Sequence, residues 1–304
     1  MEKVALVVCS SAGDHAPAAQ AEMRLLAQRL EDLGVVAAIE CWDAPAVQWD
    51  QYRAVVICQT WDYIEDFSKF SDWVNRVSAT SKLFNEAPVL HWNVHKDIYM
   101  KDLIAEDVEC VPTLFVGSEG LDGFDWGELK AEVGRRQWGG VVIKPALGCD
   151  GEGVARFDCL DEDAVSYIRK LITTSAEHAI VLIQPFISSV KSLGELSLVY
   201  IDGEFTHAVR KRAADGEYRI QERFGGFYEA TNPSSAAMQT GDATVAALRK
   251  LLPRLLSQPE TVSSSLLYTR VDVMCCHDES GRENWVVGEV ELVEPFLYFL
   301  PFPT

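Results

Sequence analysis

Acidic side chains alternate along two apolar stretches near the end of the sequence. One valine separates Arg270 from Asp272, and another separates Glu289 from Glu291. Because residues two apart on a strand share one face, each pair is predicted to point in one direction. If the two strands are neighbours, three carboxylates converge, and such oxygen ligands suit Mg²⁺ together with phosphate oxygens and water. The alternative, a solvent-facing side of amphipathic strands, is less favoured because the last strand is otherwise apolar.

Three lysines stand where a predicted strand or helix begins or ends. Lys144 ends a strand just before the glycine-bearing turn 148–153. Lys211 ends another strand between two arginines, and Lys96 opens a helix. A lysine beside a glycine turn can meet phosphate oxygens, with the turn amides helping, although exposed lysines are the rule and each one alone is weak evidence. The six histidines and eight cysteines show no metal-binding spacing, so a zinc site is not predicted.

Aromatic and polar residues follow the third predicted strand. Trp61, Asp62 and Tyr63 come soon after the apolar run 54–58. Ligands of open α/β sheets lie at the carboxyl ends of the strands, so these three residues are predicted to contact a substrate. The alternative is that Trp61 and Tyr63 cap the hydrophobic core.

The first 90 residues alternate between predicted strands and helices. Residues 4–8, 35–39 and 54–58 are apolar runs typical of buried strands, and residues 18–33 place apolar side chains at helical spacing. This alternation of strands and helices predicts a small parallel sheet with right-handed crossovers.

The rest of the chain is predicted to form two lobes that mix helices and strands. After a strand opened by Val111, the predicted strands are 140–144, 154–157, 180–184, 196–201, 204–210, 267–276 and 284–292, and the predicted helices are 94–105, 125–136, 161–174 and 243–256. The later strands follow one another with one intervening helix, so their sheet is predicted to be antiparallel. We therefore predict an N-terminal parallel α/β domain over residues 1–90 and two α+β lobes over 91–183 and 184–304. The stretch 213–237, rich in Gly, Ser, Asn and charged residues, is predicted to be a mobile loop.

The composition disfavours several classes of function. The 304 residues include 27 Lys+Arg and 46 Asp+Glu, a formal net charge of −19. So acidic a surface repels phosphate backbones and anionic lipid, which disfavours nucleic-acid and membrane-surface roles. No apolar run approaches the roughly 18–20 residues that span a bilayer. Eight cysteines without an export signal predict reduced thiols and a cytoplasmic location. The sequence does not indicate an oligomeric state, so we predict the commonest one, a homodimer.

Seven short stretches, taken in order, resemble the ATP-grasp superfamily, which includes glutathione synthetase and D-alanine–D-alanine ligase. No single stretch is specific, whereas their order across the chain is. The stretches are Lys96 after Trp92-Asn93, Val142-Ile143-Lys144-Pro145, Ile183-Gln184-Pro185-Phe186-Ile187, Gly194-Glu195-Leu196-Ser197, Lys211, Arg270-Val271-Asp272, and Glu289-Val290-Glu291 before Pro295. The Trp-Asp-Tyr, Gly-Glu-Leu-Ser and Glu-Leu-Val-Glu-Pro motifs look most like the branch that contains the D-cycloserine-forming cyclo-ligase. The resemblance implies an N-terminal parallel domain followed by two α+β lobes that clamp ATP.

The resemblance also implies a phosphate and metal site. Lys96 and Lys144 would hold the α- and β-phosphates of ATP, and Lys211 would approach the γ-phosphate. Two Mg²⁺ ions would bridge the phosphates, and their ligands would be Asp272, Glu289 and Glu291. One departure concerns this site, because Glu291 occupies a position where many relatives have asparagine.

The remaining implied roles concern the nucleoside and the reacting centre. Gln184, with the backbone of Phe186 and Ile187, would read the adenine edge, and Glu195 would bond the ribose hydroxyls. The catalytic residues implied at the developing acyl phosphate are Arg270, Lys211 and Arg219. A second departure is that acidic residues and a cysteine interrupt the glycine turn, at Cys149, Asp150 and Glu152.

The activity implied by the resemblance is that of a ligase. A small-molecule carboxylate would be activated by ATP as an acyl phosphate and then attacked by an amine to form a C–N bond. The alternatives are intramolecular ring closure, phosphoryl transfer to a group other than a carboxylate, and a nucleotide-binding module without catalysis.

Overall fold

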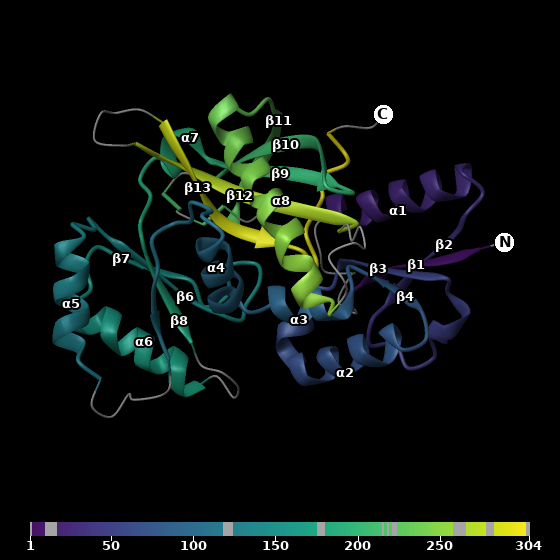
Figure 1. Ribbon diagram of the computed structural model, residues 1–304, viewed down its shortest axis with the longest axis horizontal. Helices are drawn as coiled ribbons and strands as arrows, with labels where there is room; N and C mark the ends of the chain where they lie inside the picture. Colours follow the sequence, from purple (N-terminus) through teal and green to yellow (C-terminus); the bar gives the residue numbers. More distant parts are fainter. Residues whose placement is uncertain are drawn as a thin grey trace.

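Three sheets make up the architecture of the computed structural model (Figure 1). The structure describes residues 2–9, 17–117, 124–174, 180–214, 216–217, 219–220, 224–257, 266–277 and 283–301. The strand orders are β2-β1-β3-β4, β5-β8-β6-β7 and β11-β10-β9-β12-β13. In Figure 1 the N-terminal sheet lies at the right, the central sheet at the left and the C-terminal sheet above both. One parallel sheet followed by two antiparallel ones confirms the predicted fold class.

The N-terminal sheet is parallel, as the sequence predicted, and helices cover both of its faces. Its elements are β1 (Lys3–Val8), α1 (Pro17–Asp32), β2 (Val36–Cys41), η1 (Trp49–Gln51), β3 (Ala54–Gln59), η2 (Tyr63–Asp66), α2 (Phe67–Ser78) and β4 (Lys82–Phe84). Alternation along β1 places Leu6 and Val8 in the cluster with α1, and Ala5 and Val7 in the cluster with α2. Burial on both faces explains why these strands are continuous apolar runs in the sequence.

The central sheet packs α5 and α6 against one face, and Leu182 of β8 joins the core that contains α4. Its elements are β5 (Leu114–Val116), α5 (Trp126–Arg135), β6 (Val141–Pro145), β7 (Ala155–Phe157), α6 (Glu162–Thr174) and β8 (Val181–Pro185). Val141 and Ile143 of β6 pack with α5 and α6 in one apolar cluster. Val142 and Lys144, which alternate with them, therefore point away from the helices.

The C-terminal sheet is antiparallel and also has one covered face. It consists of β9 (Glu195–Ile201), β10 (Glu204–Arg212), β11 (Phe227–Thr231), β12 (Tyr268–His277) and β13 (Glu283–Glu291). The helices around it are α3 (Ala87–Asn93), α4 (Lys96–Ala105), α7 (Val190–Leu193) and α8 (Ser235–Leu255). Side chains of α3, α4 and α8 form one core with this sheet, and α8 lies along it in Figure 1. Its opposite face carries polar residues, beside a small buried apolar cluster of Val199, Tyr268 and Leu297.

The structure corrects the sequence prediction in the C-terminal half. The predicted mobile loop 213–237 contains β11 and the start of α8, and its residues 215, 218 and 221–223 lie outside the described residues. The helix predicted over 243–256 begins already at Ser235, because the Ser234 side chain caps it by accepting from the Ala237 amide. The domain boundaries at 90/91 and 183/184 stay predictions, and the second falls inside β8.

Two further features bear on the compositional predictions. Among the described residues, no helix combines the length and the apolar character that crossing a membrane requires. All eight cysteines are free thiols, and three of them are buried.

Gly194 joins α7 to β9 in a conformation that favours glycine. Its φ is +74°, and an added Cβ would lie 2.5 Å from the carbonyl oxygen of Lys211. Gly194→Ala is therefore expected to lower the free energy of unfolding by about 1–3 kcal/mol, measured by urea denaturation. Gly134→Ala in α5 is the control, because an added Cβ meets no atom within 4 Å there. Equal stability of the two variants would contradict the strain at Gly194.

Candidate active site

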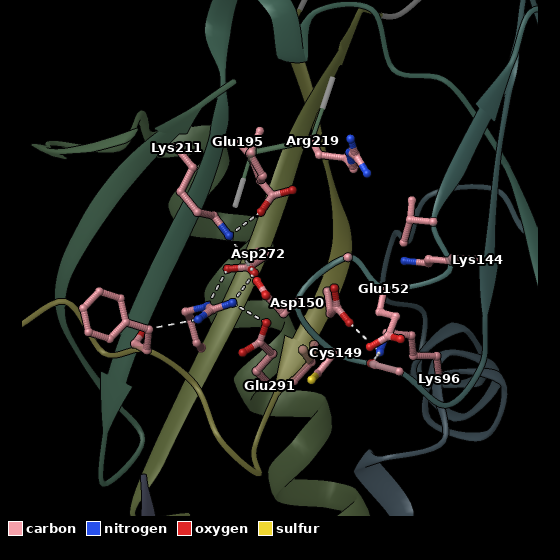
Figure 2. Close-up of a pocket in the computed structure, with 18 of the residues that line it drawn as sticks. Lys96, Lys144, Cys149, Asp150, Glu152, Glu195, Lys211, Arg219, Asp272 and Glu291 are labelled. Carbon is pink, nitrogen blue, oxygen red and sulfur yellow. Dashed lines mark hydrogen bonds and ion pairs between the residues drawn. The ribbon is translucent and has the colours of Figure 1, made fainter. Parts of the chain in front are cut away.

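A cavity of about 730 Å³ lies between the C-terminal and central sheets. Its volume is within the range of ligand pockets. Seven carboxylates and five cations are among its described lining residues, namely Asp150, Glu152, Glu195, Asp272, Glu289, Glu291 and Glu294, with Lys96, Lys144, Lys211, Arg219 and Arg270 (Figure 2). All the residues predicted for the site line this cavity except Asp62.

Strand alternation places most of these side chains on the open face of the C-terminal sheet. On β12, Val271 and Val273 belong to the core with α8, so Arg270 and Asp272 face the cavity. β9 lies beside β12, with Ser197 opposite Asp272. The predicted sharing of one face by Arg270 and Asp272 is therefore confirmed.

A β-bulge in β13 decides where its carboxylates point. Trp285 and Val287 pack into the core with α8, and strict alternation would bury Glu289 and Glu291 there too. The register shifts between β12 and β13, so that Glu289 pairs with Asp272 while Val287 pairs with Val273. Gly288 is the extra residue of the bulge, and it reverses the face to which the following side chains point. Both glutamates therefore line the cavity.

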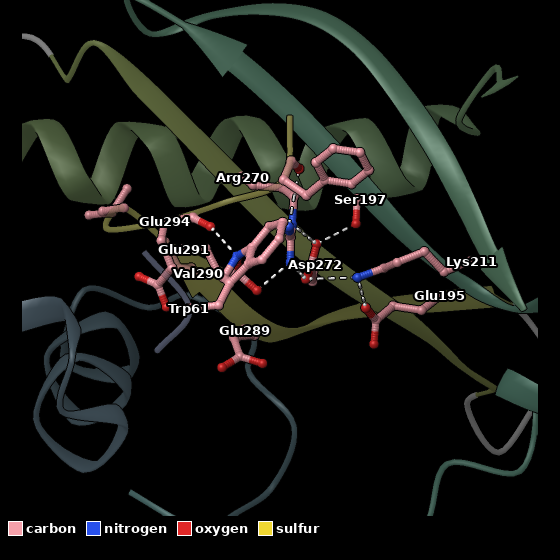
Figure 3. Close-up of polar contacts among 12 residues, drawn as sticks. Trp61, Glu195, Ser197, Lys211, Arg270, Asp272, Glu289, Val290, Glu291 and Glu294 are labelled. Carbon is pink, nitrogen blue, oxygen red and sulfur yellow. Dashed lines mark hydrogen bonds and ion pairs between the residues drawn. The ribbon is translucent and has the colours of Figure 1, made fainter. Parts of the chain in front are cut away.

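Asp272 is the centre of a buried network of charges (Figure 3). It accepts from the Ser197 hydroxyl at 2.6 Å and from Lys211 Nζ at 3.0 Å. Arg270 donates to it at 3.0 and 2.8 Å and also to Glu291. Burial acts to raise the pKa of Asp272, but the two cations outweigh it and hold the pKa well below its usual range. Lys211 also binds Glu195 at 2.5 Å.

The two other lysines differ in their partners. Lys96 Nζ lies 2.9 Å from Glu289 Oε1 and donates to the Gly148 carbonyl at 2.5 Å. The ammonium group of Lys144 has no hydrogen bond or ion pair within the described part of the chain, and burial lowers its pKa. Figure 2 shows this group pointing into the cavity. A half-buried cation without a partner is ready for an anionic ligand.

Carboxylates outnumber cations along the cavity wall, and the pKa values reflect it. Burial, supported by neighbouring carboxylates, raises the pKa of Glu291 to about 7 and that of Glu294 to about 8. No set of three or more His, Cys, Asp or Glu side chains is already gathered as a metal site in the described residues. The predicted ligands Asp272, Glu289 and Glu291 are each ion-paired instead.

The predicted adenine contacts lie at the end of β8 and just after it, in the central sheet. Gln184 is buried, and its amide donates to the Thr113 hydroxyl at 2.9 Å. The Phe186 amide donates to the Gly140 carbonyl at 2.9 Å. Because the Phe186 amide is already hydrogen-bonded, the predicted backbone contacts of an adenine are the Phe186 carbonyl and the Ile187 amide.

Two side chains from other segments complete the cavity wall. Arg219 is held by Glu217 at 2.8 Å and lies over the Phe224 ring. The Cys149 thiol of the glycine turn donates to the Trp61 carbonyl at 3.0 Å. Burial and Glu294 raise the pKa of this thiol, which makes it a poor nucleophile.

The predicted substrate contacts divide into two groups. Trp61 and Tyr63 line the cavity, and the Trp61 indole donates to the Glu294 carbonyl at 3.0 Å. Asp62 does not line it, because its carboxylate accepts from the Trp42 indole at 2.7 Å. Tyr63 also packs on Phe70, so it has the core-capping role that was the alternative.

Sequence reasoning missed the segment that follows β13. Glu294, Phe296 and Tyr298 line the cavity, although no strand or helix contains them. The backbone amides of Leu297 and Phe299 in this segment donate to the side chain of Glu22 on α1. Glu22 is buried, and it lies far from this segment in the sequence. The only available signal was a glutamate before Pro295 in an apolar, aromatic tail.

The sequence and the fold of the chain are similar to those of known proteins. Residues 129–251 match a family model described as the prokaryotic glutathione synthetase ATP-grasp domain. The crystal structure of D-cycloserine synthetase DcsG is similar, with a TM-score of 0.80 and 26% identity over 98% of this chain and 93% of that chain. Residues 129–251 therefore resemble an ATP-grasp domain, and the chain as a whole is similar in fold to D-cycloserine synthetase DcsG.

Other known proteins are similar over part or nearly all of the chain. Residues 4–85 match a family model described as the N-terminal domain of D-cycloserine synthetase DcsG. The cycloserine biosynthesis protein DcsG of Streptomyces lavendulae is 31% identical over 196 residues. That match covers 63% of this chain and 62% of the relative, less than two thirds of its length. D-Alanine–D-alanine ligase from Bacillus anthracis shares the fold, with a TM-score of 0.65 and 15% identity over 99% of this chain and 90% of that chain.

Proposed function

We propose that this protein is an ATP-grasp enzyme, namely an ATP- and Mg²⁺-dependent ligase that activates a small-molecule carboxylate for attack by an amine. The observation that carries the proposal is the gathering of lysines and carboxylates in one cavity. Lys144 lies across the cavity from Asp272 and Glu291, and Lys96 is ion-paired with Glu289. A metal–triphosphate needs both, since cations contact the phosphates and carboxylates contact the metal.

The phosphates of ATP are proposed to bind the lysines. Lys144 has no ion pair to give up within the described residues, and Lys96 would exchange Glu289 for a phosphate oxygen. Lys211 is held by Glu195 and Asp272, where it is proposed to meet the γ-phosphate. Glu195 would bond the ribose hydroxyls.

The carboxylates fit Mg²⁺ because the cavity carries an excess of them. Seven carboxylates stand against five cations among the described lining residues, and a triphosphate adds negative charge, so the loaded site favours further cations. Asp272, Glu289 and Glu291 are the proposed ligands. When bound, Mg²⁺ would neutralise charge on the transferring phosphoryl group.

The proposed chemistry has two steps. An oxygen of the substrate carboxylate attacks the γ-phosphorus, the bond to the β–γ bridging oxygen breaks, and ADP leaves. The amine nitrogen then attacks the carbonyl carbon of the acyl phosphate, loses a proton, and phosphate departs. The protein would contribute position and charge, because Arg270 and Lys211 line the cavity and would stabilise the negative charge that develops on the reacting groups. The glycine turn 148–153 and the segment around Arg219 would exclude water from the acyl phosphate.

Intramolecular ring closure is the second candidate. The match of residues 4–85 to the DcsG N-terminal domain favours it, and so does the similarity to D-cycloserine synthetase. In that case one substrate supplies both carboxylate and amine, and the product is lighter than the substrate by one water. Phosphoryl transfer to another group and nucleotide binding without catalysis are the remaining alternatives.

The test is release of ADP from Mg-ATP with a panel of amino acids, in the presence of hydroxylamine. We expect ADP formation to require both Mg²⁺ and a carboxylate, to stop with EDTA, and to yield a hydroxamate from the trapped acyl phosphate. Product mass without hydroxylamine separates ring closure from condensation. ADP formed without any carboxylate, or Mg-ATP bound without turnover, would contradict the proposal.

The other partners and the location remain predictions. Small-molecule carboxylate and amine substrates follow from the proposed reaction. The absence of nucleic-acid and membrane partners, a homodimer and a cytoplasmic location rest on the acidic composition, the free thiols and the commonest symmetry of oligomers.

A further inference from the structure

The outer edge of β13 is bonded by loop backbone and by side chains rather than by another strand of the sheet. β13 ends the strand order of the C-terminal sheet, with β12 on its inner side. Before the bulge, the Val287 amide donates to the Glu109 carbonyl and the Val111 amide donates to the Val287 carbonyl, both at 2.8 Å. After the bulge, the Tyr99 hydroxyl of α4 accepts from the Val290 amide at 3.4 Å. The stretch that carries the two glutamates therefore depends on side chains for its outer bonds.

Asn93, the last residue of α3, bonds the peptide groups on both sides of Glu291. Its side-chain nitrogen donates to the Val290 carbonyl at 2.9 Å, and its side-chain oxygen accepts from the Leu292 amide at 2.8 Å. An asparagine amide supplies a donor and an acceptor together, as a neighbouring strand does, whereas an ionised aspartate of the same size only accepts. Asn93 is 5% exposed, so water does not compete for these bonds. The amide therefore fixes the backbone at Glu291.

The corner between α3 and α4 also holds Glu289, through its side chain. Lys96, three residues after Asn93, places its Nζ atom 2.9 Å from Glu289 Oε1. The Lys96 amide donates to the Ala146 carbonyl at 3.0 Å, just before the glycine turn. One short corner therefore sets where both glutamates of β13 lie relative to that turn, and Asn93 is the part of it that acts on Glu291.

The two glutamates that Asn93 and Lys96 hold are proposed ligands of Mg²⁺, an ion that demands near-ideal octahedral geometry. A group that orients a metal ligand changes metal affinity without touching the metal. Asn93 lines the cavity, but its amide nitrogen and oxygen are both bonded to β13, so it acts through Glu291. We propose that Asn93 is a positioning residue of the metal site, which holds Glu291 in place through the backbone on both sides of it. This inference rests on the proposed ligase function.

Binding of a non-hydrolysable ATP analogue to the intact protein tests the inference. Calorimetry at a series of Mg²⁺ concentrations gives the free Mg²⁺ concentration at half-maximal binding, here called the Mg²⁺ midpoint. Asn93→Ala should raise the Mg²⁺ midpoint about 10–100-fold, the usual effect of losing a group that orients a metal ligand. Saturating Mg²⁺ should restore binding, because the lysines and the proposed adenine contacts are unchanged.

Thr240→Val is the matched control. The Thr240 hydroxyl of α8 donates to the Trp285 carbonyl at 2.9 Å, so this variant also removes a side-chain bond to β13, but before the bulge. Its Mg²⁺ midpoint should equal that of wild type to within about 2-fold, as expected for a site that shares no partner with the glutamates. Equal increases in both variants would mean that losing any bond to β13 weakens the metal, and Asn93 would then have no special part.

Hydrogen exchange of the Leu292 amide reports on the backbone without nucleotide or metal. Followed by NMR, this exchange should be faster in Asn93→Ala than in wild type, because the acceptor of the amide is removed. Thr240→Val should leave it unchanged. If the alanine variant does not fold, Asn93→Ser takes its place with the same expectations, since a serine hydroxyl is too short to reach both peptide groups.

The failure of this inference and of the proposed function are distinguishable. If the analogue does not bind the wild-type protein at any Mg²⁺ concentration, the ligase function is wrong. If it binds, and the folded Asn93 variant keeps the wild-type Mg²⁺ midpoint, the positioning role of Asn93 is wrong. Exchange of the Leu292 amide at the wild-type rate in that variant would contradict the role as well.

Discussion

Lys144→Met is expected to lower the rate of Mg-ATP-dependent ADP release by about 10²–10³-fold, the effect of removing one group that stabilises transition-state charge. Lys144 lies in the cavity beside the glycine turn and has no counter-ion within the described residues. A phosphate oxygen would therefore be its partner. Steady-state ADP release, assayed with saturating substrate, measures the loss.

The same change should leave the fold intact. Burial lowers the pKa of Lys144, so the charged form costs free energy in the folded protein, and methionine removes that cost while keeping apolar volume. We expect Tm to stay constant or rise. Lys250→Met is the control, since Lys250 is exposed on α8 and outside the cavity, and it should retain full activity. Full activity in Lys144→Met would refute its contact with the phosphates.

Apolar patterning predicted much of this fold because each sheet buries a continuous surface. The strands over 4–8 and 54–58 were predicted to within a residue or two, since burial on both faces leaves only apolar residues there. The start of α8 was missed, because its first turns from Ser235 are Ala- and Thr-rich and carry no apolar stripe. β11 was missed because an edge strand with exposed residues resembles a loop.

The site was predicted through alternation, and alternation alone gives the wrong answer for β13. Counting by twos from Val287 would turn Glu289 and Glu291 toward the core. Only the bulge at Gly288 brings them to the cavity, and a bulge depends on pairing with a partner strand, which the sequence does not display. Asp62 was misplaced for a related reason, since its partner Trp42 lies 20 residues away and is adjacent only in the fold.

The segment 293–299 after β13 was missed because its apolar residues follow neither the spacing of a helix nor that of a strand. Its conformation is fixed by hydrogen bonds to Glu22 and His207, which lie on distant elements. The buried Glu22 carboxylate needs hydrogen-bond donors from another segment. No local sequence pattern says that Glu22 is buried or which segment supplies the donors.

Glu289→Gln is expected to reduce ADP release about 10²–10³-fold and to raise the Mg²⁺ concentration needed for half-maximal activity, because it removes a charged ligand of the proposed metal site. Glu289 is a better test than Asp272. Removing Asp272 would leave Arg270 and Lys211 buried beside fewer charges, at a cost of about 3–5 kcal/mol in stability. Glu289 pairs with Lys96 alone, and its side chain is 30% exposed.

The effect on stability gives this prediction an independent check. Burial acts to raise the pKa of Glu289, but Lys96 and Lys144 outweigh it and lower the pKa below 4.5. A carboxylate with a lowered pKa stabilises the fold above its unfolded pKa and loses that contribution as the pH falls through the folded value. Wild type should therefore exceed Glu289→Gln in stability at neutral pH, and the difference should shrink below about pH 4.5. Unchanged Mg²⁺ dependence in a folded Glu289→Gln protein would remove Glu289 from the metal site, because the lost carboxylate would then have had no part in binding the ion.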